Sequence, residues 1–388
     1  MKTANRLAGI GEYYFSTKLR EIDELNRQGK DIINLGIGSP DLPPHPEVIK
    51  VLQDEAAKPN VHAYQSYKGS PVLRKAISEW YERWYGVNLN ADSEILPLIG
   101  SKEGIVHICM TYLNDGDKVL VPDPGYPTYT SAVKLAGGIC IGYELKEENG
   151  WTPDWNQLEV QVKNNPEIKL IFANYPHMPT GKLPTKDLFE KFVAFARKHN
   201  LLIVHDNPYS FILNENPMSM LAVKDSKDVV LELNSLSKAQ NMAGWRVGML
   251  VGAKERIDEV LRFKSNMDSG MFLPVQLAAA KALGLGKDWY NQLNVTYQNR
   301  RQKVYELLEV LECDFSREQA GLFVWAKVPS HFKDGYAMSD HVLYNSRVFI
   351  TPGGIFGKAG ENFIRVSLCC NEQKLEASLE RTKLTVAK

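Results

Sequence analysis

Short, uninterrupted apolar runs recur along the chain up to residue 252, and longer segments with helical periodicity lie between them. Six runs rich in Val, Ile and Leu span residues 94–99, 118–122, 169–176, 201–209, 229–237 and 246–252. A strand with one face in water alternates apolar and polar residues, whereas a strand buried on both faces reads as a continuous apolar run. The alternation of such strands with helices predicts an α/β fold with a mostly parallel central sheet flanked by helices.

The helical segments carry start and stop signals of their own. Ser70 and Pro71 have the residue types of an N-cap and a first helical position, and Gly86 follows the last apolar residue of that segment. A second helix is expected from about Thr185 to His199, because four apolar side chains recur there at helical spacing.

The pattern changes after about Met271. Two helical segments are followed by three short apolar runs, "GLFVWAKV", "RVFITPGGIFG" and "FIRVSL", which predicts a separate, smaller α+β domain. A chain of 388 residues is longer than one core usually supports. We therefore expect a large domain at 45–275 and a small domain formed by 1–44 and 276–388.

The composition excludes several classes of protein. The 46 basic residues balance the 46 acidic ones, so the charge predicts neither a nucleic acid partner nor a membrane partner. The five cysteines are scattered without C-x-x-C spacing, which favours a reducing compartment over a disulfide framework. The chain shows no signal peptide pattern and no apolar window of about 18 residues. A cytoplasmic enzyme acting on small molecules is expected.

Polar clusters rich in Gly and Pro follow five of the predicted strands. They read "GSKEG", "PDPGYP", "NYPHMPTG", "HDNPY" and "NSLSK". In an open parallel sheet, ligands bind at the carboxyl ends of the strands. The five clusters are therefore expected to meet in one crevice.

The stretch "NSLSKAQNMAGWRVGM" (234–249) places Lys238 after two serines, Ser235 and Ser237, and eight residues before Arg246. A lysine held in a cleft forms a Schiff base with a carbonyl cofactor and then shuttles protons. The hydroxyls and the guanidinium provide hydrogen-bond donors for a phosphate. The pattern S-x-S-K followed by x-G-W-R-x-G resembles the pyridoxal-phosphate lysine motif of the class I/II aminotransferases, which have fold type I. The other possibility is a surface lysine beside a paired arginine.

The resemblance assigns roles to two further clusters. Asp206 and Tyr209 match the family's D-x-x-Y, in which the aspartate keeps the pyridine nitrogen protonated and the tyrosine donates to the ring oxygen. "LIGSKEG" resembles the phosphate loop, so the amides of Ser101 and Lys102, at a helix start, are expected to bind phosphate. Without the resemblance, a turn aspartate and a plain helix cap explain these residues equally well.

Four more positions follow from the same resemblance. Tyr126 in "PDPGYP" corresponds to the aromatic residue that stacks on the cofactor ring. Tyr64 corresponds to the tyrosine that crosses a dimer interface to the partner's phosphate, with Tyr67 as the rival assignment, and this implies a homodimer. Gly38 lies in a loop that faces the substrate, and Arg365 in "GENFIRVSL" corresponds to the residue that binds the substrate's α-carboxylate.

One position departs from the family pattern N-P-x-N-P-T-G. Met178 stands where the second asparagine would donate a hydrogen bond to the cofactor's ring oxygen, and a thioether is not a donor. Tyr209 is then the main donor expected, unless Asn174 or Asn207 reaches the same oxygen. A missing donor would raise the pKa of the nitrogen that links Lys238 to the cofactor.

Taken together, the motifs imply a pyridoxal 5'-phosphate-dependent aminotransferase that moves the α-amino group of an amino acid to a 2-oxo acid. A β-lyase on the same cofactor uses the same residues and is the first alternative. A regulator that binds the cofactor without turnover is the second. The histidines show no H-E-x-x-H pattern, so no metal is expected. The substrate stays open between aromatic, methionine-like and diaminopimelate types, because Arg20, Arg262 and Arg347 are equal candidates for a second carboxylate-binding residue.

Overall fold

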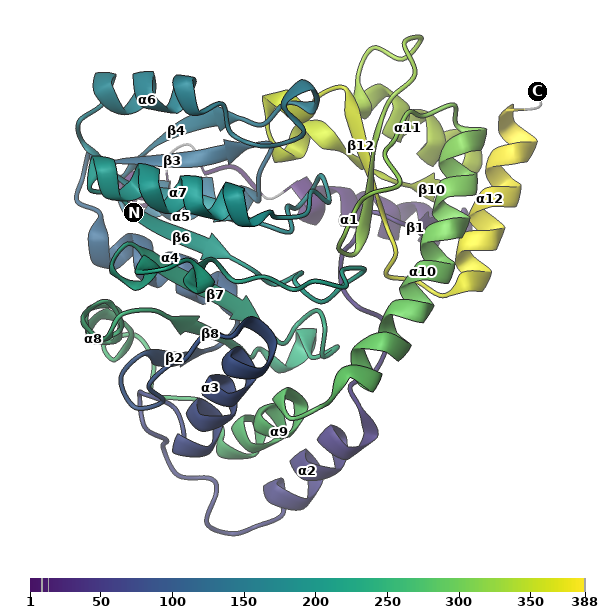
Figure 1. Ribbon diagram of the computed structural model, residues 1–388. Coiled ribbons are helices and arrows are strands. Elements are labelled where there is room, and N and C mark those ends of the chain that lie inside the picture. The colour runs from purple at the N-terminus through teal and green to yellow at the C-terminus, as the bar shows by residue number, and fades with distance from the viewer. Residues whose placement is uncertain (8–9, 13, 387–388) are drawn as a thin grey trace.

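A computed structural model describes residues 1–7, 10–12 and 14–386. In this part of the chain, seven strands form the central sheet, in the order β2-β8-β7-β6-β5-β3-β4 (Figure 1). The strands are β2 (Ile95–Leu98), β3 (Lys118–Asp123), β4 (Ile139–Glu144), β5 (Ile168–Asn174), β6 (Leu202–Asp206), β7 (Val230–Ser235) and β8 (Gly248–Val251). Strand β8 is antiparallel to both of its neighbours, and the other pairs are parallel. The predicted α/β fold with a mostly parallel sheet is confirmed.

Strand β4 is not among the predicted strands, because it lies at the edge of the sheet. Its residues are mostly exposed or half-buried, and its sequence "ICIGYE" lacks the continuous apolar character of the others. The central strand β5 shows the opposite pattern. Leu170 and Phe172 belong to one buried cluster and Ile171 and Ala173 to another, so both faces of this strand are covered.

Helices cover the two faces of the sheet (Figure 1). On one face, the buried cluster includes residues from α4 (Ser101–Tyr112), α5 (Pro127–Leu135) and α8 (Lys254–Lys264). On the other face, α3 (Pro71–Tyr85), α6 (Trp155–Asn164) and α7 (Lys186–His199) contribute, while α9 (Leu273–Leu283) packs on α3 and on α2 (Pro46–Ala56).

The predicted helix signals are confirmed at both helices. The Ser70 hydroxyl accepts a hydrogen bond from the Leu73 amide at 3.2 Å, and Gly86 ends α3 in the left-handed conformation with φ 65°. The Thr185 hydroxyl accepts from the Leu188 amide at 3.1 Å at the start of α7.

A second, antiparallel sheet lies beside the central one and contains β11 (Thr351–Pro352), β12 (Phe363–Ser367) and β9 (Phe323–Lys327). It is accompanied by α10 (Lys287–Val310), α11 (Gly335–Ser346) and α12 (Glu372–Val386) (Figure 1). The amino-terminal segment joins this part of the molecule, because β1 (Ile33–Asn34), which follows α1 (Tyr14–Arg27), pairs with β10 (Val348–Phe349).

The topology decides where ligands bind. Strands β2, β3, β5, β6 and β7 run in the same direction, so their carboxyl ends lie along one edge of the sheet, and the antiparallel β8 begins there. The five polar clusters of the sequence follow these five strands. Among the described residues, no helix is long and apolar enough to cross a membrane.

Candidate active site

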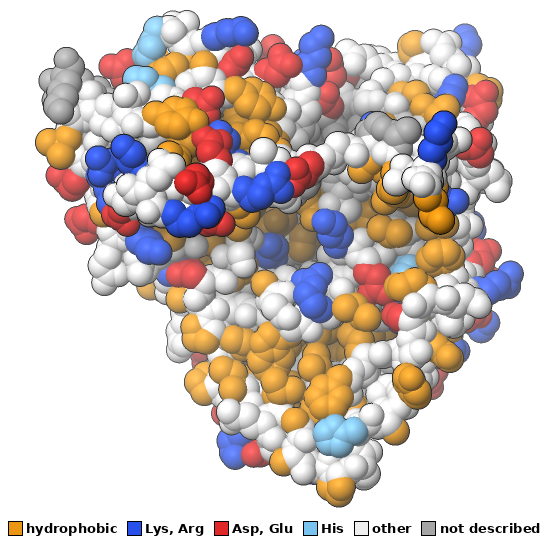
Figure 2. Space-filling view, turned by 180° about the vertical axis from the view of Figure 1, so that it is seen from behind, with side chains coloured by type: hydrophobic (Ala, Val, Ile, Leu, Met, Phe, Trp, Pro, Cys, Tyr) orange, Lys and Arg blue, Asp and Glu red, His pale blue; other side chains and the backbone are white. Residues whose placement is uncertain are grey.

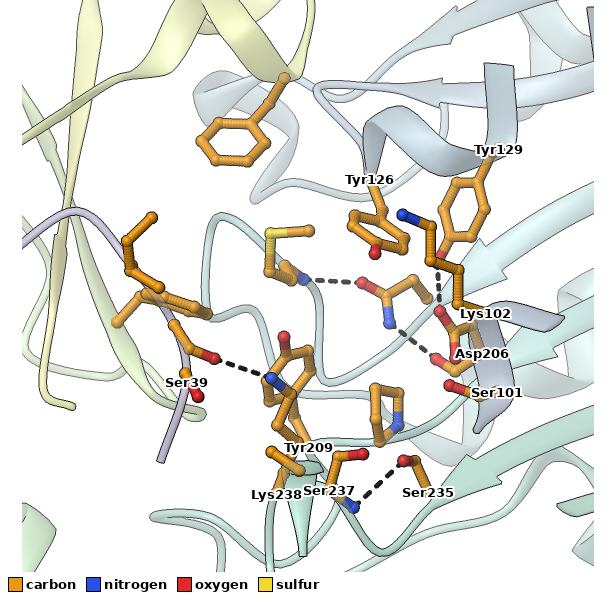
Figure 3. A pocket seen from close by; sticks show the side chains of 18 of the residues that line it. Ser39, Ser101, Lys102, Tyr126, Tyr129, Asp206, Tyr209, Ser235, Ser237 and Lys238 are labelled. Atoms are coloured by element: carbon orange, nitrogen blue, oxygen red, sulfur yellow. Dashed lines mark hydrogen bonds between the residues drawn. The ribbon is translucent and has the colours of Figure 1, made fainter. Parts of the chain in front are cut away.

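A cavity of about 370 Å³ lies at this edge, between the central sheet and the three-stranded sheet. Figure 3 shows Ser39 on one side of it, Ser101 and Lys102 on the other, and Lys238 between them. The lining residues come from the amino-terminal loop, from the carboxyl ends of the strands and from the three-stranded sheet. They are Phe15, Ile37, Gly38, Ser39, Ser101, Lys102, Tyr126, Tyr129, Asn174, Met178, Asp206, Pro208, Tyr209, Ser235, Ser237, Lys238, Ala243, Arg246, Phe323, Phe356 and Arg365.

One end of the cavity is formed by the start of helix α4. Ser101 and Lys102 occupy its first two positions, where the backbone N–H groups have no partner within the helix. Gly100 precedes them with φ 86°, and a Cβ there would lie 2.0 Å from Nη2 of Arg246. Glycine is therefore required at position 100 for two reasons: the backbone adopts a positive φ there, and a side chain would clash with the guanidinium that lies close to the helix end.

Arg246 and two serines complete this end. Arg246 Nη1 donates to the Ser237 hydroxyl at 3.4 Å and to the Ala243 carbonyl at 2.9 Å. The Ser235 hydroxyl accepts from the Ser237 amide at 3.1 Å. Amides at a helix start, hydroxyls and a guanidinium gathered in one place form a binding site for a phosphate group.

Helix α4 is also fixed from behind. Glu103 Oε1 lies 2.6 Å from His107 Nε2, and Lys264 Nζ lies 2.6 Å from an oxygen of Asp268. The ligand atoms of the three residues Glu103, His107 and Asp268 fall within 4.8 Å of one another, as in a metal site. Because the buried Lys264 ammonium already supplies a positive charge there, we assign this cluster to the support of α4.

Lys238 lies in the middle of the cavity. Its Nζ donates to the carbonyl of Gly38 at 2.8 Å and lies 5.7 Å from the centre of the Tyr209 ring. Burial lowers the pKa of the Lys238 ammonium. A lowered pKa favours the neutral amine, which is the nucleophilic form.

Asp206 ends strand β6 beneath the cavity. Its Oδ2 accepts from the Tyr129 hydroxyl at 2.7 Å, while Oδ1 is buried without a hydrogen-bond partner. Burial raises the pKa of this carboxyl to about 6. A buried carboxylate oxygen without a hydrogen-bond partner costs free energy, unless a hydrogen-bond donor of a bound ligand pairs with it.

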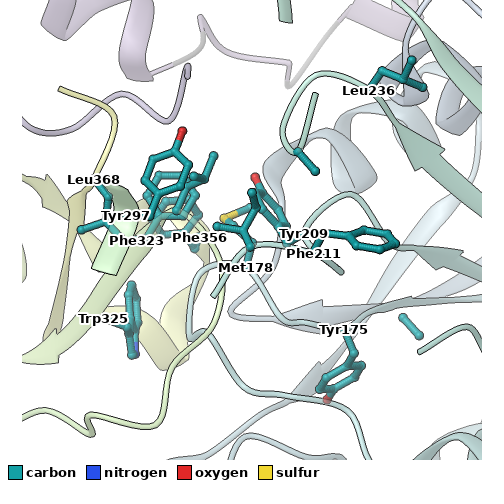
Figure 4. Close-up of a cluster of buried hydrophobic side chains, with 14 of the residues drawn as sticks. Tyr175, Met178, Tyr209, Phe211, Leu236, Tyr297, Phe323, Trp325, Phe356 and Leu368 are labelled. Atoms are coloured by element: carbon teal, nitrogen blue, oxygen red, sulfur yellow. The ribbon is translucent and has the colours of Figure 1, made fainter. Parts of the chain in front are cut away.

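Arg365 defines the other end of the cavity. It is buried in β12, and its Nη2 donates to the Gly36 carbonyl at 2.9 Å. Its Nη1 lies 3.2 Å from Sδ of Met178. In Figure 4, Met178 and Tyr209 face Phe323 and Phe356 across the junction between the two sheets.

The two asparagines considered as donors behave differently. Asn174 lines the cavity, but its amide accepts from the Met178 N–H and donates to the Asp206 carbonyl. Asn207 donates to the Met218 carbonyl and does not line the cavity. Tyr209 lines it, and burial raises the pKa of its phenol.

Most of the predicted site residues meet in this cavity, and Tyr126 is among them, with its ring edge-to-face to Tyr129 at 5.6 Å. Tyr64 is the exception: it is 91 % exposed and does not line the cavity of its own chain. Sequence reasoning missed Tyr129, three residues after Tyr126. It also missed the apolar side chains Phe15, Ile37, Phe323 and Phe356, which come from distant segments and carry no local sign that they line a cavity.

The comparisons with known proteins identify the family of this chain. The chain matches the family of class I and II aminotransferases over residues 30–381. It is 40% identical to the LL-diaminopimelate aminotransferase of Dehalococcoides mccartyi over 383 residues, covering 98% of each chain. It is 38% identical to that of Halothermothrix orenii, over 99% of this chain and 98% of the relative.

Solved structures show the same fold. A substrate-bound structure of BacF from Bacillus subtilis is 34% identical and superimposes with a TM-score of 0.94, covering 99% of this chain and 98% of the other. A variant of the aspartate aminotransferase of Thermus thermophilus is 25% identical, with a TM-score of 0.92 over 99% of this chain and 100% of the other.

The architecture is that of the fold type I pyridoxal-phosphate enzymes. The chain belongs to the class I and II aminotransferases and is a pyridoxal-phosphate-dependent aminotransferase. The residues of the cavity fit this cofactor. The unpartnered oxygen of Asp206 matches a protonated ring nitrogen, and the Ser101–Arg246 end matches the phosphate.

Proposed function

We propose that Lys238 would hold the cofactor by a bond to its carbonyl carbon. Once the substrate's amino group takes its place, the released Lys238 amine would move a proton between the substrate's α-carbon and the cofactor. Pyridoxal phosphate supplies an electron sink for the bond broken at the α-carbon. The proposal rests on the position of the Lys238 amine, which lies between Arg365 and the end of the cavity that fits a phosphate. Its lowered pKa supports a role as base, because a neutral amine accepts the proton.

The other residues divide the remaining tasks. Asp206 Oδ1 holds the proton at the ring nitrogen, and Tyr209 donates to the ring oxygen. Tyr126 stacks on the ring. The phosphate is bound by Arg246 and by the residues at the start of α4 and the end of β7, which are Ser101, Lys102, Ser235 and Ser237.

Arg365 and Gly38 position the substrate. The guanidinium binds the α-carboxylate with two parallel hydrogen bonds, and the Gly38 loop closes the cavity opposite Lys238. Orientation of the substrate aligns the bond to be broken with the electron sink, and this alignment lowers the barrier. The amino group then passes to a 2-oxo acid.

The test is exchange of the substrate's α-proton with solvent in D₂O, together with amino transfer, in the cofactor-loaded protein. Lys238→Ala is expected to abolish both, and the exposed Lys224→Ala serves as the control with both retained. Exchange at the wild-type rate in Lys238→Ala would show that another group carries the proton.

We further propose that the enzyme works as a homodimer and that Tyr64, or alternatively Tyr67, reaches the partner's phosphate. The two residues are 91% and 46% exposed. Their loop lies against the segment 265–272, where a Cβ on Gly270 would meet the Gln65 carbonyl at 2.8 Å, and Met267 and Phe272 of that segment are also exposed. Figure 2 shows hydrophobic side chains gathered on one face of the molecule, which is typical of an interaction surface.

Sedimentation of the wild type and the cofactor affinity of Tyr64→Phe and Tyr67→Phe test this. A dimer in which only one of the two variants binds the cofactor weakly identifies the crossing tyrosine. A monomer with full activity would refute the proposal.

We also propose two domains, with one change to the expected boundary. The limit at 275 falls inside α9, and α9 packs on α2 and α3. The second boundary is therefore placed after α9, and limited proteolysis is expected to cut between α9 and α10 rather than within α9.

A further inference from the structure

Most of the charged side chains of the cavity lie at one end, and most of its apolar side chains lie at the other. Among the described residues that line it, five side chains carry charge: Lys102, Asp206, Lys238, Arg246 and Arg365. The first four belong to the part assigned to the cofactor. Arg365 is thus the one charged side chain of this lining that remains for the substrate.

Aromatic rings surround that guanidinium. Its central carbon lies 3.7 Å from the centre of the Phe323 ring, 4.6 Å from that of Phe356 and 5.8 Å from that of Phe15. Met178 contributes its thioether at 3.2 Å from Nη1. With Ile37, these side chains form what we call the apolar wall: Phe15, Ile37, Met178, Phe323 and Phe356.

The apolar wall is held in place by its neighbours. A Cβ on Gly38 would lie 2.1 Å from Phe323, so the loop touches that ring directly. The Ser367 hydroxyl donates to the Ile37 carbonyl at 2.7 Å, and Arg300 binds Asp41 of the same loop at 2.6 and 2.9 Å. These contacts fix the loop that carries Ile37 and the ring of Phe323.

The three arginines considered for a second carboxylate lie elsewhere. Arg20 pairs with Glu12 on the surface, Arg262 is exposed on α8, and Arg347 is the left-handed C-cap of α11. None of them lines the cavity of its own chain. Where a substrate packs a charged end against the apolar wall, no further charged side chain in the lining of the same chain compensates that charge, and its burial against rings costs free energy.

We propose that this enzyme selects amino acids with a bulky, uncharged apolar side chain, aromatic or aliphatic, over those whose side chain ends in a charged group. The relatives are named for diaminopimelate. The side chain of this amino acid ends in an ammonium and a carboxylate, so we expect it to be among the disfavoured substrates. The inference rests on the proposed binding of the α-carboxylate by Arg365. Burial of an apolar side chain against the apolar wall supplies the selectivity, in proportion to the area removed from water.

The first experiment is the amino-acid half of the reaction, followed by the loss of the cofactor's visible absorbance without an acceptor. Phenylalanine, leucine and methionine are expected to exceed glutamate, lysine and LL-diaminopimelate in kcat/KM by about tenfold or more. Equal or faster conversion of diaminopimelate or glutamate would overturn the inference. Conversion of no amino acid at all would overturn the proposed function instead.

A binding measurement separates the two failures. Two unreactive acids, 3-phenylpropanoate and the dicarboxylate pimelate, are titrated into the cofactor-loaded enzyme by calorimetry. Tighter binding of 3-phenylpropanoate by about tenfold is expected, because only pimelate brings a second charge to the apolar wall. Tighter binding of pimelate would contradict the inference whatever the activity.

A pair of variants locates the selectivity. Phe356→Ala removes a ring of the apolar wall, and Phe332→Ala removes a half-buried ring packed near His341 outside the cavity. Phe356→Ala is expected to lower kcat/KM for phenylalanine about tenfold relative to alanine, a substrate too small to need the wall. Phe332→Ala should leave this ratio unchanged. An unchanged ratio in Phe356→Ala would exclude this ring from substrate selection.

Discussion

The two ends of the cavity solve different binding problems. The Ser101–Arg246 end consists of helix amides, hydroxyls and a guanidinium, brought together by the ends of neighbouring strands. The Arg365 end has one guanidinium enclosed by rings from β9, from the turn between β11 and β12, and from the amino-terminal segment. Every enzyme of this kind binds the same phosphate group, so the end of the cavity that binds it is formed by local motifs. The side chain of the substrate differs between enzymes, and the end of the cavity that receives it is formed by apolar residues packed together from distant segments.

Removal of Arg365 is expected to have the largest effect. Arg365→Ala leaves the substrate's α-carboxylate without its buried partner, and such a loss costs about 100-fold or more in kcat/KM. The loss should be similar for every amino acid, and the affinity for the cofactor should stay within about threefold. Steady-state kinetics and a cofactor titration check both statements. A loss of cofactor affinity as large as the loss of kcat/KM would show that the two ends are not independent.

Arg246→Ala is the reciprocal change at the phosphate end. It removes one charged donor while the amides of Ser101 and Lys102 remain, so the affinity for pyridoxal phosphate is expected to fall by about 10- to 50-fold. At saturating cofactor, the relative kcat/KM values for different amino acids should be unchanged. A changed substrate preference would contradict the division between the two ends.

The sequence predicts these two ends unequally. Ser101, Lys102, Lys238 and Arg246 lie in short motifs at strand ends, where a single segment fixes both the residue and its surroundings. The five residues of the apolar wall come from separate parts of the chain. Met178 and Phe356 lie in motif segments, but nothing local marks any of the five as a residue that contacts the substrate, since a buried apolar side chain reads as core. The central sheet was likewise predictable from continuous apolar runs, whereas the edge strand β4 was not.

Protonation of Asp206 distinguishes the empty protein from the loaded one. Because burial raises the carboxyl pKa to about 6, the folded apoprotein binds this proton more tightly than the unfolded chain. This contribution to stability is therefore present at low pH and is lost as the pH rises through about 6. Between pH 7 and pH 4 it amounts to roughly 2 kcal/mol.

The check is urea unfolding of the wild-type and Asp206→Asn apoproteins across this range. The wild type should gain roughly 2 kcal/mol over the variant as the pH falls from 7 to 4. With pyridoxal phosphate bound, the gain should disappear, because a protonated ring nitrogen keeps the carboxylate ionised. Parallel pH profiles of the two apoproteins would show that Asp206 is not perturbed.

Met178→Asn is expected to have the smallest effect. It places a hydrogen-bond donor beside Arg365, where the thioether now lies. In the loaded protein, the added donor should lower the pKa of the Lys238 nitrogen by less than about one unit. A spectroscopic pH titration measures this. A pKa that is unchanged or higher would show that residue 178 does not reach the cofactor's ring oxygen.

The most direct test of the account is to locate the bond between the protein and its cofactor. The loaded enzyme is reduced with borohydride, digested and analysed by peptide mass spectrometry. The account predicts one modified peptide, with the added mass on Lys238, and none after the same treatment of Lys238→Ala. Modification of another lysine in place of Lys238, or a modified peptide that persists in the variant, would contradict it.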